Sequence, residues 1–139
     1  MALTAPRQLY ETQGQTNILE YPSAGNDIYY QGALMVSSAA GYADVPSDAA
    51  ALIPLGVYTG RQGQEFSVAS GAHDTIEIEE GYVWVPFSGA AQTDVGEVFY
   101  LADDSTVTKT IGSKTWGIMC KGFKTGYVRL DFAKPIKMA

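Results

Sequence analysis

The chain has little of what most enzymes and metal sites require. Its 139 residues include one cysteine, Cys120, and one histidine, His73, which excludes an internal disulfide framework and a zinc site built from several cysteines. Charged residues make up 17% of the chain, below the roughly 25% of an average soluble domain. The longest near-apolar stretch, residues 49–55, is far shorter than the roughly 20 residues of a membrane-spanning helix. We therefore expect no enzyme, no cofactor or metal site, and no membrane association.

Common catalytic and phosphate-binding motifs are absent as well. No two of the 15 glycines lie two positions apart, which excludes G-x-G-x-x-G, and neither G-x-x-x-x-G-K-[ST] nor G-x-S-x-G occurs. His73 beside Asp74 could act as a base and its orienting group, with Cys120 as nucleophile. Adjacent strand residues point to opposite faces, however, and the nearby Gly71 favours a surface turn. Cys120 itself alternates with Trp116 and Ile118 and is expected to be buried and unreactive.

Two groups of acidic residues are further candidates. Glu77 and Glu79 share one face of an expected strand, about 7 Å apart, which is near the carboxyl separations of glycosidases. Because Ile76 and Ile78 supply the opposite, core-facing side, an ordinary solvated strand edge is the better interpretation. The acidic pair in residues 103–106 could hold calcium, but it lacks the spaced acids of a calcium loop and is typical of a β-turn.

Charge is segregated along the chain. Nine basic and fifteen acidic residues give a net charge of −6, which argues against nucleic acid as a direct partner. Residues 109–139 hold seven basic residues and one acidic residue, a net +6, while the other 108 positions net −12. This basic segment is either a chance cluster of solvated side chains or an end that docks on a partner. Its docking candidates are Lys121, Lys124, Lys134 and Lys137.

The chain from residue 26 to 139 has the pattern of an all-β domain. Short apolar segments of strand length alternate with glycine-rich turns, and no amphipathic helix of ordinary length occurs. Ser47 is placed to cap one helical turn over residues 48–52. We expect a single compact, Gly-rich antiparallel β-barrel or sandwich over 26–139.

Residues 1–25 differ from the rest. They are rich in Gln and Thr, and neither a 3.6-residue nor a two-residue period organises their apolar positions. They form either a frayed terminus or an extended N-terminal arm that orders against a partner. The apolar anchors of such an arm would be Leu9, Tyr10, Ile18 and Tyr21.

Two expected strands carry apolar residues on both faces. Tyr82 and Trp84 point away from Val83 and Val85, and the pair Val98 and Tyr100 opposes Phe99 and Leu101 in the same way. A half-solvated antiparallel strand alternates apolar with polar residues, so something must cover the second face. A further layer of the same domain or a neighbouring subunit would do this. We favour the neighbour, with self-association through Tyr82, Trp84, Val98 and Tyr100.

Several segments together resemble a known family. They are residues 32–36, 55–57, 76–86, 95–100 and 116–118. In order and spacing they are similar to the small capsid decoration (cement, head-stabilising) proteins of tailed bacteriophages. The chain departs from that pattern in its longer arm and in the insertion over residues 42–52.

The resemblance implies a non-enzymatic virion structural protein on the exterior of the assembled phage capsid. It would clamp neighbouring subunits of the major capsid protein as a homo-oligomer, a trimer in preference to a dimer, without touching DNA. It would lie on the capsid surface after assembly in the host cytoplasm. Two alternatives stay open: a phage tail, baseplate or fibre β-domain, and a small β-barrel that binds glycans or other ligands through Trp84, Trp116 and tyrosines.

Overall fold

The computed structural model describes residues 2–6, 17–25, 27–60, 65–66 and 74–138. In these residues the protein is built from thirteen β-strands and one short 3₁₀-helix, η1 (Gln92–Asp94). All pairings between these strands are antiparallel. The expected all-β, antiparallel fold is thereby confirmed, and it takes the sandwich form, since within the described residues neither large sheet closes into a barrel.

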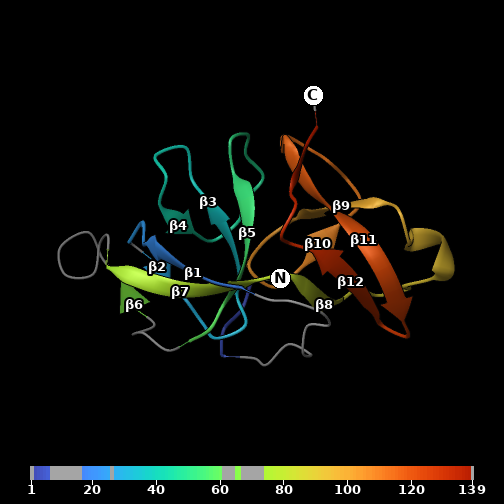
Figure 1. The fold of residues 1–139 in the computed structure, drawn as a ribbon, viewed down its shortest axis with the longest axis horizontal. Helices are drawn as coiled ribbons and strands as arrows, with labels where there is room; N and C mark the ends of the chain where they lie inside the picture. Colours follow the sequence, from blue (N-terminus) through green and yellow to red (C-terminus); the bar gives the residue numbers. More distant parts are fainter. Residues whose placement is uncertain (1, 7–16, 26, 61–64, 67–73, 139) are drawn as a thin grey trace.

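Two main sheets lie side by side (Figure 1). The N-terminal sheet has the order β1 (Asn17–Pro22), β7 (Thr75–Glu80), β5 (Ile53–Tyr58), β3 (Leu34–Ser37), β4 (Ala43–Asp44). The C-terminal sheet has the order β10 (Val107–Thr108), β9 (Val98–Leu101), β11 (Trp116–Lys124), β12 (Tyr127–Asp131), β8 (Tyr82–Pro86), and β13 (Ile136–Lys137) also pairs with β11. A small separate sheet joins β2 (Asp27–Ile28) to β6 (Glu65–Phe66).

The core has two parts, one on each face of β3. Leu34 and Val36 belong to a cluster that includes Val83, Val85 and Phe99 of the C-terminal sheet. Met35 points the other way and joins a second cluster, whose other main members are Tyr29, Tyr58, Ile76 and Ile78. Because successive side chains of a strand alternate between faces, a strand that is apolar throughout can serve both clusters.

Gly81 alone separates β7 from β8, so the chain passes from one sheet into the other across a single residue. Its φ is +133°, a backbone conformation that glycine tolerates far better than other residues. Its carbonyl accepts a 2.8 Å hydrogen bond from the Phe132 N–H, which continues the β8–β12 ladder. The two sheets are therefore linked by a nearly continuous strand.

Strand pairing begins earlier than the sequence pattern indicates. β1 pairs with β7 over its whole length, from Asn17 opposite Glu80 to Pro22 opposite Thr75. An arm that extends to residue 25, with strands only from residue 26, is therefore wrong for residues 17–22. These residues lack a clear alternation because both faces of β1 carry apolar side chains.

The predicted helical turn over residues 48–52 does not form. Instead the Asp48 carboxylate accepts a 2.8 Å hydrogen bond from the Ser113 N–H and a 3.0 Å bond from the Lys114 ammonium. Ala51 adopts a left-handed conformation with φ +67°. Contacts to a distant loop thus override the local capping signal.

Candidate functional site

The outer face of the C-terminal sheet carries a continuous set of aromatic and cationic side chains, which we call the cation–aromatic face. It consists of Tyr82 and Trp84 on β8, Tyr127 and Arg129 on β12, and Lys124 on β11. Antiparallel register places Arg129 opposite Trp84, and Lys124 opposite Tyr127. The alternate residues of β8 and β12, among them Val83, Val85 and Val128, point into the core.

Cations and rings alternate across this face. The Arg129 guanidinium carbon lies 5.0 Å from the ring centre of Tyr82 and 5.8 Å from that of Trp84. The Lys124 ammonium lies 4.7 Å from the ring centre of Trp84 and 5.3 Å from that of Tyr127. Each such contact contributes about 0.5–1 kcal/mol at an exposed site. Together they hold five side chains in one defined arrangement.

Gly122 leaves room for this arrangement. It lies opposite Arg129, and a Cβ atom there would lie 3.6 Å from Trp84 and 3.7 Å from Arg129. A larger side chain at this position would therefore compete with the Trp84 ring and the Arg129 stem for the same space.

This surface combines the residue types that dominate protein interfaces. Tyr, Trp and Arg are enriched among the residues that carry most of the binding energy in protein–protein contacts. Tyr82, Trp84, Tyr127 and Arg129 are all partly buried, while Lys124 is exposed. The face can therefore bury rigid aromatic area against a partner and can meet acidic groups with two cations.

The interpretation of the doubly apolar strands holds in part. Tyr82 and Trp84 do lie on the face opposite Val83 and Val85, and side chains of the same chain partly cover them. Tyr100 is only 6% exposed, so its own chain already covers it, and an interface role for Tyr100 is wrong. A Cβ atom on Gly117 would collide with Val98 and Tyr100, which shows how closely β11 approaches them.

The four docking lysines are exposed but do not gather at one end. Lys124 ends β11 on the cation–aromatic face, whereas Lys137 pairs with Trp116 at the start of the same strand. Eight residues of strand separate these two positions, or about 26 Å. Lys121 lies between them on β11, and Lys134 lies in the turn before β13. The basic segment therefore follows the length of β11.

Of the four expected arm anchors, Leu9 and Tyr10 lie outside the described residues. Ile18 is 47% exposed, and its side chain is available to a partner. Tyr21 packs against the second core cluster of its own chain, as does Leu3. The Tyr21 side chain is therefore partly buried in its own chain and is only partly accessible to a partner.

A second surface feature is a groove of about 500 Å³ beside Trp116. Trp116 and Ile53 form its apolar walls, and Ser38, Thr115 and Lys137 supply polar groups. The left-handed residue Ala51 lies on its rim, and the Ala51 N–H approaches the Thr115 hydroxyl at 3.5 Å.

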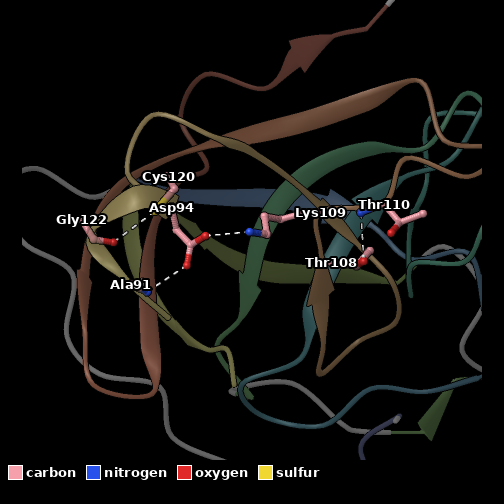
Figure 2. A network of polar contacts seen from close by, with 7 residues as sticks. All are labelled: Ala91, Asp94, Thr108, Lys109, Thr110, Cys120 and Gly122. Atoms are coloured by element: carbon pink, nitrogen blue, oxygen red, sulfur yellow. Dashed lines mark hydrogen bonds and ion pairs between the residues drawn. The ribbon is translucent and has the colours of Figure 1, made fainter. Parts of the chain in front are cut away.

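Asp94 and Cys120 both make hydrogen bonds within the fold (Figure 2). The Asp94 carboxylate is 3% exposed and accepts hydrogen bonds from the Lys109 ammonium at 2.8 Å and the Ala91 N–H at 2.9 Å. The bond from Lys109 lowers the pKa of the Asp94 carboxyl. The Cys120 thiol is fully buried, lies 3.2 Å from the Gly122 carbonyl, and has its pKa raised by burial. The expected buried, unreactive cysteine is confirmed as to burial.

Other candidates from the sequence have structural explanations. Asp103 Oδ1 accepts bonds from the backbone and hydroxyl groups of Ser105 and Thr106, at 2.7–3.2 Å, which is a β-turn arrangement. Ile76 and Ile78 are fully buried as expected. β7 is not an edge strand, because it pairs with β1 on one side and with β5 on the other, and Glu77 and Glu79 are partly buried on the face opposite Ile76 and Ile78. His73 lies outside the described residues.

Sequence reasoning did not identify Lys124, Tyr127 and Arg129 as neighbours of Trp84. The alternation over residues 127–132 indicates that Tyr127 and Arg129 share an outer face. The pairing of β12 with β8, more than 40 residues apart in the chain, gives no local signal. Only the register brings the five side chains together.

The protein is an all-β sandwich whose C-terminal sheet presents the cation–aromatic face. Among the described residues no group of three His, Cys, Asp or Glu side chains could hold a metal ion. In the same part of the chain, no helix has the length and apolar character needed to cross a membrane. Neither a protein-family model nor a curated protein sequence matches the chain.

Proposed function

We propose that this protein is a non-enzymatic structural protein of a phage virion, which binds the exterior of the assembled capsid and clamps neighbouring major capsid subunits. The cation–aromatic face carries this proposal. It is a sheet surface that presents Tyr82, Trp84 and Arg129, residue types that are enriched in contacts with protein partners.

The chemistry of the face indicates the surface that it would bind. Arg129 and Lys124 favour acidic side chains on the partner, and the aromatic rings favour apolar area beside them. The order of the strands and glycine turns resembles that of phage decoration proteins, which bind capsids. We therefore take a capsid surface with acidic side chains and apolar area as the partner.

Stabilisation would follow from binding linkage. A protein that binds several assembled capsid subunits, but not the dissociated ones, stabilises the assembly by the free energy of its binding. The net charge of −6 is consistent with a role outside the shell, away from packaged DNA.

Electron microscopy of particles of the encoding phage, with and without this protein, tests the proposal directly. Density for a small β domain on the shell is expected only when the protein is present. In a sedimentation assay with such particles, Trp84→Ser should weaken binding by at least about tenfold, since burial of a large aromatic side chain exceeds 1.4 kcal/mol. The matched control is Ile111→Ser, at an apolar residue that is 40% exposed away from this face. Equal loss in both variants, or particles that never carry the protein, would refute the proposal.

The groove beside Trp116 supports a second candidate, a glycan-binding domain. A partly buried indole, such as that of Trp116, beside hydroxyl groups and a lysine can stack on a sugar and hydrogen-bond to it. Addition of a bound glycan should then raise the melting temperature of the wild-type protein. The melting temperature of the Trp116→Ala variant should not change, because that variant lacks the indole on which the sugar would stack. An unchanged wild-type melting temperature across a broad glycan panel would exclude this candidate.

A further inference from the structure

Two of the outer strands have long edges with no strand partner in the described part of the chain, apart from a parallel bridge between Ser23, which follows β1, and Ala43 of β4. β1 is the outermost strand of the N-terminal sheet, and β8 is the outermost strand of the C-terminal sheet. They have six and five residues, whereas the outermost strands at the other ends of the two sheets, β4 and β10, have two residues each. An open edge of this length is a template for pairing with another strand.

The hydrogen-bond pattern shows which residues face outward from each edge. In antiparallel pairs, residues alternate between bonding to the partner and pointing away from it. The bond from the Ser23 N–H to the Asp74 carbonyl fixes this alternation for β1, so the backbone groups of Ile18 and Glu20 point outward. For β8 the alternation is fixed by two backbone hydrogen bonds, from the Phe132 N–H to the Gly81 carbonyl and from the Phe87 N–H to the Gly126 carbonyl. Tyr82 and Trp84 therefore point their backbone groups outward.

The side chains at these outward positions are complementary. Ile18 is 47% exposed and Glu20 is exposed, both on one face of β1. Tyr82 and Trp84 lie on the cation–aromatic face, with the Arg129 guanidinium over Tyr82 and the Lys124 ammonium over Trp84. One edge thus offers an aliphatic and an acidic group, and the other offers aromatic rings and cations.

We propose that β1 of one copy adds antiparallel to the β8 edge of a second copy. In the register that we infer, Ile18 lies opposite Trp84 and Glu20 lies opposite Tyr82, so that the Glu20 carboxylate reaches the Arg129 guanidinium. Leu19 then lies opposite Val83, which keeps apolar side chains together on the other face. All four outward-facing residues have an N–H to donate, and Pro22 and Pro86 mark the ends of the paired stretch.

Charge decides among the pairings that these two edges allow. Two β8 edges together would gather two copies of Arg129 and Lys124 on one face. Two β1 edges would gather glutamates with no cation on either strand. Only the mixed pairing matches opposite charges. Because it joins different surfaces of two copies, it repeats from copy to copy and either closes into a ring or extends as a chain.

Mixing two edge variants tests this inference without any capsid, so its failure is separate from failure of the proposed function. Glu20→Pro removes an outward N–H on β1, and Tyr82→Pro removes one on β8; both spare the backbone hydrogen bonds within the chain. Sedimentation velocity of the purified full chain should show self-association of the wild type. Each variant alone should associate at least about tenfold more weakly, since the hydrogen bond from that N–H is lost and the proline ring obstructs close approach of the added strand. An equimolar mixture should form a one-to-one dimer, because each variant keeps the edge that the other has lost.

Every other outcome overturns the inference. A monomeric wild type at high concentration excludes self-pairing, and a Glu20→Pro variant that associates normally indicates pairing between two β8 edges. Normal association of Tyr82→Pro indicates pairing between two β1 edges. If a proline variant fails to fold, Glu20→Arg and Arg129→Glu serve the same design through charge repulsion. Each charge variant alone should associate weakly, whereas their mixture should associate again as an alternating assembly, because both mixed pairings bring opposite charges together. Failure of that mixture to associate counts against the inferred edges.

Discussion

At the scale of single residues, buried and partly buried carboxylates link the fold to pH. Hydrogen bonds from the Lys109 ammonium and the Ala91 N–H lower the pKa of Asp94. Burial alone would raise the pKa of Asp103, but hydrogen bonds, among them those from Ser105 and Thr106, bring it down to about 2. Burial raises the pKa of Asp44, so this group acts in the opposite direction.

The Asp103 turn predicts acid sensitivity. A carboxyl with a pKa of about 2 in the folded protein and about 3.9 in the unfolded chain stabilises the fold above the higher value. The unfolded chain takes up the proton first as pH falls, so this contribution is lost between about pH 4 and pH 2. The free energy of unfolding by urea should therefore depend less on pH in Asp103→Asn than in the wild type over this interval. Parallel pH curves for the two proteins would contradict the assignment.

At the scale of elements, β1 is the strand whose role the structure changes most. It covers one edge of β7, and its Tyr21 side chain packs against the second core cluster. Deletion of residues 1–24 should therefore lower the free energy of unfolding by about 2 kcal/mol or more, from lost apolar burial and lost strand pairing.

Equilibrium urea unfolding of the truncated and complete chains measures this loss. Ile18→Ser is the matched control, because that side chain is 47% exposed and its replacement should change the free energy by no more than about 0.5 kcal/mol. A truncated chain as stable as the complete one would show that residues 1–24 are dispensable for the fold.

The sequence predicts the elements that have strong local patterns. The alternation of residues 75–79 places Ile76 and Ile78 in the core, and Val83 and Val85 follow the same rule. The sequence pattern does not predict β1, because its pairing partner β7 is more than 50 residues away and both faces of β1 carry apolar side chains. The sequence does not predict the cation–aromatic face either, since β8 and β12 are brought together by long-range strand pairing and not by a local pattern.

At the scale of the whole molecule, the positive charges of the C-terminal segment are spread along one strand and are not gathered at one end. The four candidate lysines follow β11, and Lys124 is the one among them that belongs to the cation–aromatic face, through its contacts with Trp84 and Tyr127. Long-range attraction should speed encounter with a partner, whereas apolar contacts on the face should control how long the complex lasts.

Under the proposed function, the rate of docking on capsid particles should fall as salt rises, with little change in the dissociation rate. Exposed charges are screened beyond about 8 Å at physiological ionic strength. Lys124→Glu should slow association more than Lys137→Glu, because Lys137 lies at the far end of β11. Surface plasmon resonance with immobilised particles can measure both rates. Equal slowing by the two reversals would place the docking surface elsewhere on the basic segment.

The single residue between β7 and β8 also has a mechanical consequence. Because Gly81 joins the sheets without a loop, tension applied to one sheet passes into the other through covalent bonds. Pulling along this line would load the hydrogen bonds of β1, β5 and β12 against β7 and β8 in shear, so that many must break together. A protein held at both ends of this line would resist stretching more strongly than one whose two halves were joined by a slack linker.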